Sequence, residues 1–383
     1  MLIVTAVFGI VANLAHPVTP TLLKSLNVPS YMFGVAFSAM SLTSFLFSPF
    51  WGKISSRLGP AKLVVISFIG YSLGQYLFMI ANSEVTVVLA RMVAGLFIGG
   101  INVCQLLYIV ENSELSKRAE VLASNATINA VCGAVGYLIG GFLGDISIMT
   151  NFIVQIIGLL LAGVLTWLIV ADSERSEADS ISNIMKQSNP FYALFNSKGI
   201  ITSFLFVFFI LTVAINFVTT SYDQVFNYFV KDVFDFPPSY NGILKAIVGF
   251  STLVLNSTVC IWILKRTNEK KSLVYLLGVC LCILLGIIFV NDTITIMILN
   301  VLFLSLTLMC FPIMQSILAN VSKKDNGMII GLFNSMRSIG QVSGALVAGF
   351  VYSVNTKGPF IIGTIILVFC MVAANINYKQ TKE

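Results

Sequence analysis

The chain has 383 residues, of which 57% are hydrophobic and only 10% are charged, and its formal net charge is +6. An ordinary soluble domain carries roughly 25% charged residues. This composition therefore excludes soluble enzymes, nucleic-acid-binding proteins and disordered chains, and it indicates that lipid is the main solvent of the protein. The seven cysteines lie in apolar runs without paired spacing, so we interpret them as packing residues and expect no metal site and no disulfide.

Twelve apolar runs follow one another along the chain. A helix that crosses a bilayer needs about 20 predominantly apolar residues, and the runs that provide them are 1–23, 30–50, 62–81, 85–110, 121–144, 150–170, 200–229, 240–263, 272–290, 293–319, 327–352 and 359–376. One long polar connection divides the runs into six plus six. We predict an all-α integral membrane protein with two six-helix bundles, residues 1–170 and 200–383, joined by a cytoplasmic linker at 171–199.

Basic residues gather in the loops on one side of these runs. If the N-terminus is cytoplasmic, sixteen Lys and Arg residues lie on the cytoplasmic side, and only Lys24, Lys231 and Lys357 lie outside. The positive-inside rule therefore predicts that both termini are cytoplasmic. The net charge of +6 then reports topology rather than a nucleic-acid partner.

The two halves of the sequence resemble each other at a constant offset of 208 residues. The offset aligns glycines, prolines and loop residues across five runs, among them Pro29 with Pro237, Gly34 with Gly242, Gly136 with Gly344 and Gly141 with Gly349. Two parallel halves imply an axis along the membrane normal and a site between the halves near mid-membrane. The offset also places Met1 opposite Phe209, inside the seventh run, so we expect the first helix to begin upstream of Met1. The first run lacks the basic leader and small-residue cleavage site of a signal peptide.

The loop after the second run reads SPFWGKISSRLGPAK, residues 48–62. It resembles the loop between helices 2 and 3 of the major facilitator superfamily, which has the form G-x-x-x-D-R/K-x-G-x-R-K. Gly52, Arg57, Gly59 and Lys62 match this form, whereas Ser56 replaces the acid. The resemblance implies that the four matching residues take part in conformational change. Because the acid helps to latch the two halves together in family members, the latch is in question here.

Three further segments carry the same resemblance. The run LARMVAG, residues 89–95, is similar to the fourth-helix motif of the superfamily, whose arginine, here Arg91, is implied to act in proton coupling. The glycines of the fifth run, including Gly136, Gly140 and Gly141, resemble the glycine-rich motif of the antiporter branch, although Gly136-Tyr137 replaces the usual Gly-Pro. Close helix packing would explain the same glycines. The segment PVTPTLLK, residues 17–24, resembles the P-V-x-P-x-x-L-K segment of bacterial twelve-helix drug/proton antiporters.

A few charged or titratable residues fall within the apolar runs. A charge near the bilayer centre costs at least ~2.5–3.5 kcal/mol on insertion scales and usually has a role. Asp223 is the only acid clearly within a run, and its carboxyl group can load and release a proton if its partner changes during transport. We predict proton coupling by Asp223, Arg91 and His16. The alternatives are a static Asp223–Lys245 ion pair and a packing role for His16.

Positive charge predominates among the interior residues. Arg91, Lys245, Arg337 and Asp223 together give roughly +2, and no acid lies between Leu304 and Phe311, where many cation exporters carry one. This balance favours a neutral, zwitterionic or anionic substrate. The candidate substrate-binding residues are the basic, polar and adaptable apolar side chains of the expected cavity helices: Arg337, Lys245, Tyr222, Asn216, Gln224, Phe311 and Met314.

These features predict a secondary active transporter in a bacterial plasma membrane. We expect it to export small amphipathic molecules, drug-like or metabolite, in exchange for protons, as a monomer and without a cofactor. No ATP-binding loop appears in the sequence. The first alternative is an importer or exchanger of organic anions or zwitterions from the same superfamily. The second, a membrane enzyme or sensor, would need a nucleophile, a metal cluster or a soluble domain, and none is visible, so we expect no enzymatic activity.

Overall fold

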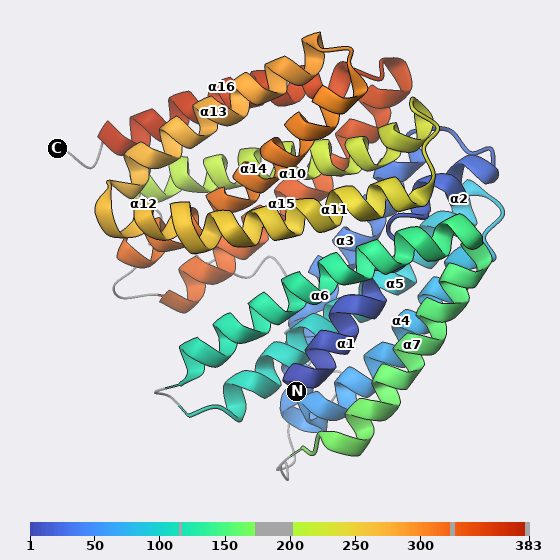
Figure 1. Ribbon diagram of the computed structural model, residues 1–383. Helices are drawn as coiled ribbons and strands as arrows, with labels where there is room; N and C mark the ends of the chain where they lie inside the picture. The colour runs from blue at the N-terminus through green and yellow to red at the C-terminus, as the bar shows by residue number, and fades with distance from the viewer. Residues whose placement is uncertain (115–116, 173–201, 322–325, 380–383) are drawn as a thin grey trace. The chain divides into compact units, whose positions relative to one another are not determined.

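The computed structural model describes the chain except for residues 115–116, 173–201, 322–325 and 380–383, and every regular element in the described part is a helix (Figure 1). The predicted linker at 171–199 lies almost entirely outside the described residues. The helices of the first sequence half are α1 (Leu2–Ala12), α2 (Thr19–Ser25), α3 (Met32–Leu58), α4 (Pro60–Met79), α5 (Glu84–Glu111), α6 (Arg118–Ile146) and α7 (Ile148–Ile169). Those of the second half are α10 (Ser203–Asp232), α11 (Pro238–Leu255), the π-helical turn η1 (Asn256–Cys260), α12 (Ile261–Arg266), α13 (Glu269–Phe289), α14 (Thr293–Val321), α15 (Asn326–Val354) and α16 (Gly358–Lys379).

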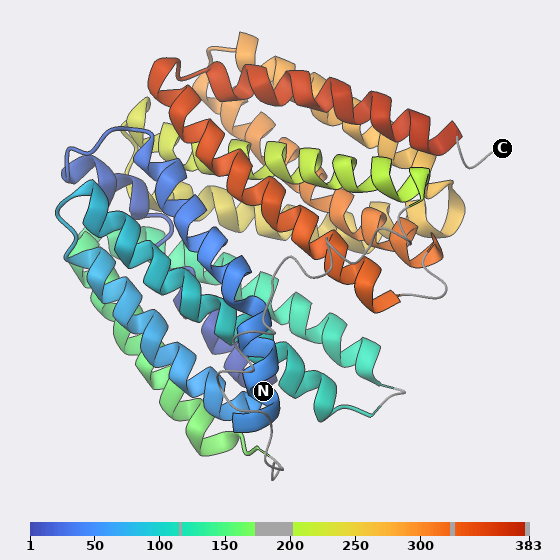
Figure 2. The ribbon, with the colours of Figure 1, turned by 180° about the vertical axis from the view of Figure 1, so that it is seen from behind.

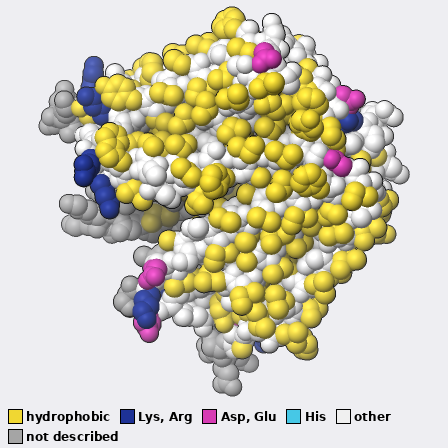
Figure 3. All heavy atoms as spheres, viewed as in Figure 1, with side chains coloured by type: hydrophobic (Ala, Val, Ile, Leu, Met, Phe, Trp, Pro, Cys, Tyr) yellow, Lys and Arg dark blue, Asp and Glu magenta, His cyan; other side chains and the backbone are white. Residues whose placement is uncertain are grey.

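Ten helices in the described part are long and apolar enough to cross a membrane, when α11, η1 and α12 are taken together. The ten do not include α1, α2 or α15. Large apolar side chains are exposed along these helices, for example Phe250, Trp262 and Phe289, and Figure 3 shows apolar atoms over most of the visible face, with Lys and Arg near helix ends. Water would penalise such a surface and lipid does not. The protein is therefore an all-α, multi-pass membrane protein, and the count of twelve crossings stays a prediction.

The first predicted run, residues 1–23, contains two helices, α1 and most of α2. The helix stops after α1 and resumes at α2, because Pro17 and Pro20 lack the backbone N–H groups that a continuous helix would direct at the carbonyls four residues earlier. Gln155 of α7 supports the end of α1, since its Nε2 donates to the carbonyl oxygens of Val11 at 3.1 Å and Ala12 at 3.0 Å. The interruption is thus a supported break between two helices.

The chain forms two compact units, which do not coincide with the two sequence halves. Unit 1 comprises Met1–Val28, Ala39–Pro190 and Val230–Ala246, and unit 2 comprises Pro29–Ser38, Phe191–Phe229 and Ile247–Glu383. Each unit contains most of one predicted bundle and a short segment of the other. The predicted boundaries at 170 and 200 stay a prediction.

Helices pack pairwise within each unit. In unit 1, α1 lies along α6, and α4 lies between α5 and α7, as the view from behind shows (Figure 2). In unit 2, α13 packs against both α14 and α16. The core of unit 1 includes the fully buried rings of Phe68 and Tyr71 on α4.

The predicted internal repeat recurs in the packing. In unit 1, Gly242 of α11 lies against Gly141 and the carbonyl of Tyr137, both in α6. In unit 2, Gly34 of α3 lies against Gly349 and the carbonyl of Ala345, both in α15. A Cβ atom at Gly242 would come within 3.1 Å of the Gly141 Cα, and one at Gly34 within 2.9 Å of the Gly349 Cα. The offset of 208 relates every member of one contact to its counterpart in the other, so the same close approach is built twice.

Candidate transport site

Arg91 of α5 is buried in unit 1 and touches three other helices. Its guanidinium carbon lies 3.7 Å from the centroid of the Phe78 ring, Nη2 donates to Thr19 Oγ1 at 3.1 Å, and Nη1 donates to Met40 Sδ at 3.8 Å. Thr19 Oγ1 in turn donates to the carbonyl of Ala15. Arg91 therefore connects α5 to the start of α2, directly after the break in the first helix.

His16 lies in the break itself and stacks on Tyr137 of α6, with ring centroids 5.3 Å apart and an interplanar angle of 15°. Lys245 of α11 also faces Tyr137, with Nζ 5.7 Å from the ring centroid. Two predicted site residues from distant parts of the sequence thus meet on one ring. That ring belongs to the tyrosine that replaces the proline of the antiporter motif.

The glycines of α6 allow α1 to approach closely. A Cβ atom at Gly136 would collide with the carbonyl oxygen of Ile10, and one at Gly140 would collide with that of Leu14. Asn151 of α7 also donates to the carbonyl of Gly140. The packing interpretation accounts for these glycines, and the role in conformational change that the motif implies stays a prediction.

The loop between α3 and α4 is held by an acid from another segment. Asp172, which follows α7, accepts hydrogen bonds from the backbone N of Ala61 at 2.8 Å and of Lys62 at 2.9 Å, and so caps α4. Gly59 has φ +86° and lies against this carboxylate, so the position requires glycine. Gly52 has only ordinary van der Waals neighbours, and the Arg57 side chain is exposed. Sequence reasoning missed Asp172, because nothing local to either segment predicts the contact.

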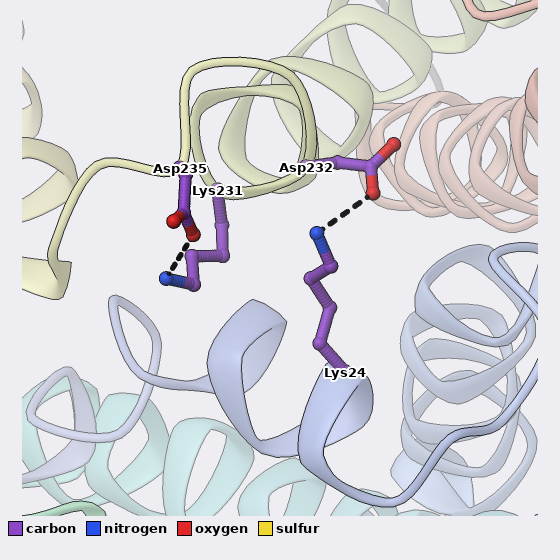
Figure 4. A network of polar contacts seen from close by, with 4 residues as sticks. All are labelled: Lys24, Lys231, Asp232 and Asp235. Carbon is purple, nitrogen blue, oxygen red and sulfur yellow. Dashed lines mark hydrogen bonds and ion pairs between the residues drawn. The ribbon is translucent and has the colours of Figure 1, made fainter.

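A polar network lies at one end of unit 1 (Figure 4). Lys24 of α2 forms an ion pair with Asp232 at the end of α10, with Nζ 3.1 Å from Oδ1, and Lys231 forms another with Asp235 at 2.6 Å. The hydrogen bond and the positive charge from Lys231 lower the pKa of the exposed Asp235 carboxyl group. Asp145 at the end of α6 accepts a hydrogen bond from the backbone N of Ser239, at the start of α11. This end of unit 1 is therefore held by charged side chains.

Arg337 of α15 lies in unit 2, with its guanidinium carbon 3.8 Å from the centroid of the Phe311 ring. Phe311 stacks on Phe333 of α15, and Phe333 stacks on Phe208 of α10. Phe208 stacks further on Phe204, which carries Lys270 at 4.3 Å from its ring centroid. Two predicted substrate-binding residues are thus brought together at the end of a continuous aromatic stack.

Tyr222 and Met314 are buried in unit 2. The hydroxyl of Tyr222 donates to Asn300 Oδ1 at 3.1 Å, and its ring lies 4.3 Å from that of Phe303 and also contacts Phe360. Met314 is 1% exposed. Packing between α10, α14 and α16 accounts for Tyr222 without a substrate.

The remaining predicted residues are on α10. Asp223 and Gln224 are half-buried, and Asn216 is half-buried beside Gly340 of α15. Asp223 belongs to unit 2 and Lys245 to unit 1, so the alternative of a static ion pair between them stays a prediction.

Comparisons with known proteins agree with the resemblance found in the sequence. The model of the Major Facilitator Superfamily matches residues 1–319. Multidrug resistance protein 1 of Bacillus subtilis (strain 168) is 24% identical over 375 residues, which cover 96% of this chain and 92% of that protein. Quinolone resistance protein NorA of Staphylococcus aureus (strain COL) is 23% identical over 349 residues, covering 91% and 87%.

Solved structures show the same fold. The bacterial homologue of the human lysosomal transporter Spinster, in an inward-facing and occupied conformation, superposes with a TM-score of 0.77 at 12% identity and covers 99% of this chain and 95% of that chain. The human organic anion transporter MFSD10 superposes with a TM-score of 0.67 at 15% identity, covering 97% and 99%. The chain belongs to the Major Facilitator Superfamily of membrane transporters.

Proposed function

We propose that this transporter exports small amphipathic molecules in exchange for protons, from the cytoplasm of a bacterial cell across its plasma membrane, with both termini cytoplasmic and as a monomer. The named relatives that match more than nine tenths of the chain are resistance proteins, which supports export. Their identity of 23–24% leaves the substrate to be worked out from this chain's own residues.

Asp223 carries the proposal of proton coupling. Among the described helices, it is the only acidic residue that lies more than four residues from a helix end. A carboxyl group at such a position in a membrane helix usually has a role in moving ions or protons, because its charge is costly there. Reversible protonation of Asp223 would link proton entry to substrate exit.

Arg91 and His16 take a supporting part in this proposal. Both contact the break between α1 and α2. Arg91 donates a hydrogen bond to Thr19 at the start of α2, and His16 lies within the break. A helix break has fewer backbone hydrogen bonds to lose than a continuous helix, so it is a natural place for bending. In this proposal Arg91 holds the break in position, and Asp223 carries the proton.

Replacement of Asp223 by Asn tests the proposal. The purified protein is reconstituted in vesicles and offered three labelled aromatic compounds of fixed charge: a sulfonate, a sulfobetaine and a quaternary ammonium compound. For a compound that the wild type transports, Asp223→Asn should abolish accumulation driven by a pH gradient and retain exchange of labelled for unlabelled compound. Asp235→Asn, in an exposed loop, is the matched control and should retain both. Gradient-driven accumulation by Asp223→Asn would contradict the assignment.

A further inference from the structure

The two membrane arginines with described ring contacts differ in how their donors are used. The guanidinium carbons of Arg91 and Arg337 each lie over a phenylalanine ring, 3.7 Å and 3.8 Å from its centroid. The Nη atoms of Arg91 donate to Thr19 and Met40. The Nε atoms of both arginines are buried without a partner. For Arg337, no hydrogen bond or ion pair is formed from any nitrogen within the described part of the chain. The described residues thus provide acceptors for the Nη donors of Arg91 but not for those of Arg337.

The position of Arg337 makes this difference costly. It lies eleven residues after the start of α15 at Asn326, or about 16 Å along the helix at 1.5 Å per residue. A guanidinium group stays charged in proteins, and a charge at membrane depth is normally paired or faces a polar cavity. The cation–π contact with Phe311 offsets only part of that cost. An anion that binds Arg337 would supply the missing partner.

The ring beside the guanidinium group of Arg337 is held in an aromatic stack. Phe311 stacks on Phe333, with centroids 6.0 Å apart and an interplanar angle of 17°, and Phe333 stacks on the buried Phe208. The guanidinium carbon of Arg337 lies over the Phe311 ring, and the N–H donors of a guanidinium group lie in its plane and form a rigid fork. That fork matches the two oxygens of a carboxylate.

We propose that Arg337 is the subsite for the carboxylate of an organic anion or zwitterion that this protein transports. The inference rests on the proposed transport function and names the substrate class. The ring of Phe311 lies against the guanidinium, and Asn216 of α10 lies beside Gly340, about one turn further along α15. The interior charge balance of roughly +2 agrees with a substrate that brings negative charge.

Equilibrium binding to the detergent-purified full chain tests the proposal without a gradient. The probes are 2-naphthoate, its neutral amide and the 2-naphthylmethyl trimethylammonium cation, measured by calorimetric titration. The wild type should bind the carboxylate at least about tenfold more tightly than the amide, a difference of about 1.4 kcal/mol. Arg337→Gln should remove this preference, and Arg337→Lys should retain only part of it, because lysine keeps the charge and loses the fork. Lys265→Gln, at the exposed end of α12, is the control and should keep the full preference.

Two further outcomes separate the possible failures. If the wild type shows no preference for the carboxylate, or if Arg337→Gln keeps it, the subsite is refuted. If Arg337→Gln does not fold, Arg337→Lys carries the test, since it should weaken carboxylate binding and leave amide binding unchanged. A carboxylate preference that depends on Arg337, in a protein that ignores a pH gradient, would contradict proton coupling and leave the subsite standing.

Discussion

Gln155 Nε2 lies 3.0 Å from the carbonyl oxygen of Ala12, and this bond holds the end of α1 where the first helix breaks. The same nitrogen donates to Val11. Gln155→Leu would remove this bond from the buried Ala12 carbonyl and leave the Val11 carbonyl with the bond from the backbone N of Leu14. A buried carbonyl that loses its partner costs about 1–3 kcal/mol. We expect a clear fall in the apparent melting temperature of the detergent-purified protein. Thr364→Val is the control, because it removes only a side-chain bond to a helix carbonyl, and it should have a much smaller effect.

Repeat-related glycines should respond alike to alanine. A Cβ atom at Gly136 would collide with the carbonyl of Ile10, and one at Gly344 would collide with that of Phe217. Gly136→Ala and Gly344→Ala should each lower the melting temperature and reduce transport. Gly331→Ala, where nothing lies within 4 Å, should be neutral or stabilising by up to about 1 kcal/mol, because alanine is the better helix former. Equal behaviour of all three variants would contradict the packing role.

The turn before α4 should be sensitive to both of its partners. Gly59→Ala places a side chain at φ +86°, a conformation that costs a non-glycine residue about 1–3 kcal/mol. Asp172→Asn replaces one of the two acceptor oxygens that cap α4 with a donor. Both variants should melt at lower temperature than the wild type, whereas Gly52→Ala, in a roomier position, should not. A wild-type melting temperature for Asp172→Asn would show that the cap is dispensable.

The ion pair between Lys24 and Asp232 should contribute little to stability. The two side chains are 36% and 27% exposed, and pairs at this exposure contribute about 0–1 kcal/mol. Lys24→Gln, Asp232→Asn and the double variant should therefore melt within a few degrees of the wild type, and salt at about 0.5 M should remove the difference. A large effect that persists in high salt would show that the pair is more strongly desolvated than its exposure indicates.

The sequence predicts most of the helices because a helix that crosses a lipid bilayer must be long and apolar, and such runs are visible in the sequence. The repeat also predicts correctly which glycines correspond, since Gly34 and Gly242 make the same contact in the two units. What the sequence could not provide is the pairing of distant polar groups. Gln155 and Asp172 have no local signal, because each acts on a segment more than 100 residues away. The break in the first helix had a visible signal in Pro17 and Pro20, but the apolar run obscured it.

The sequence predicted the site residues one at a time, and the structure shows which of them lie next to one another. Arg337 and Phe311 are adjacent, and so are His16 and Lys245 through Tyr137. Residue type alone could not show that the Nη atoms of Arg91 donate hydrogen bonds to Thr19 and Met40. These contacts depend on how the helices pack.

Transport under an imposed pH gradient tests the central claim of proton exchange most directly. Vesicles that contain the wild-type protein, with the membrane potential clamped to zero, are given the three fixed-charge aromatic compounds at equal concentrations. Proton exchange predicts that at least one compound accumulates when the vesicle interior is acidic, and that none does when the interior is alkaline. Accumulation only with an alkaline interior, or accumulation that is indifferent to the gradient, would contradict export in exchange for protons.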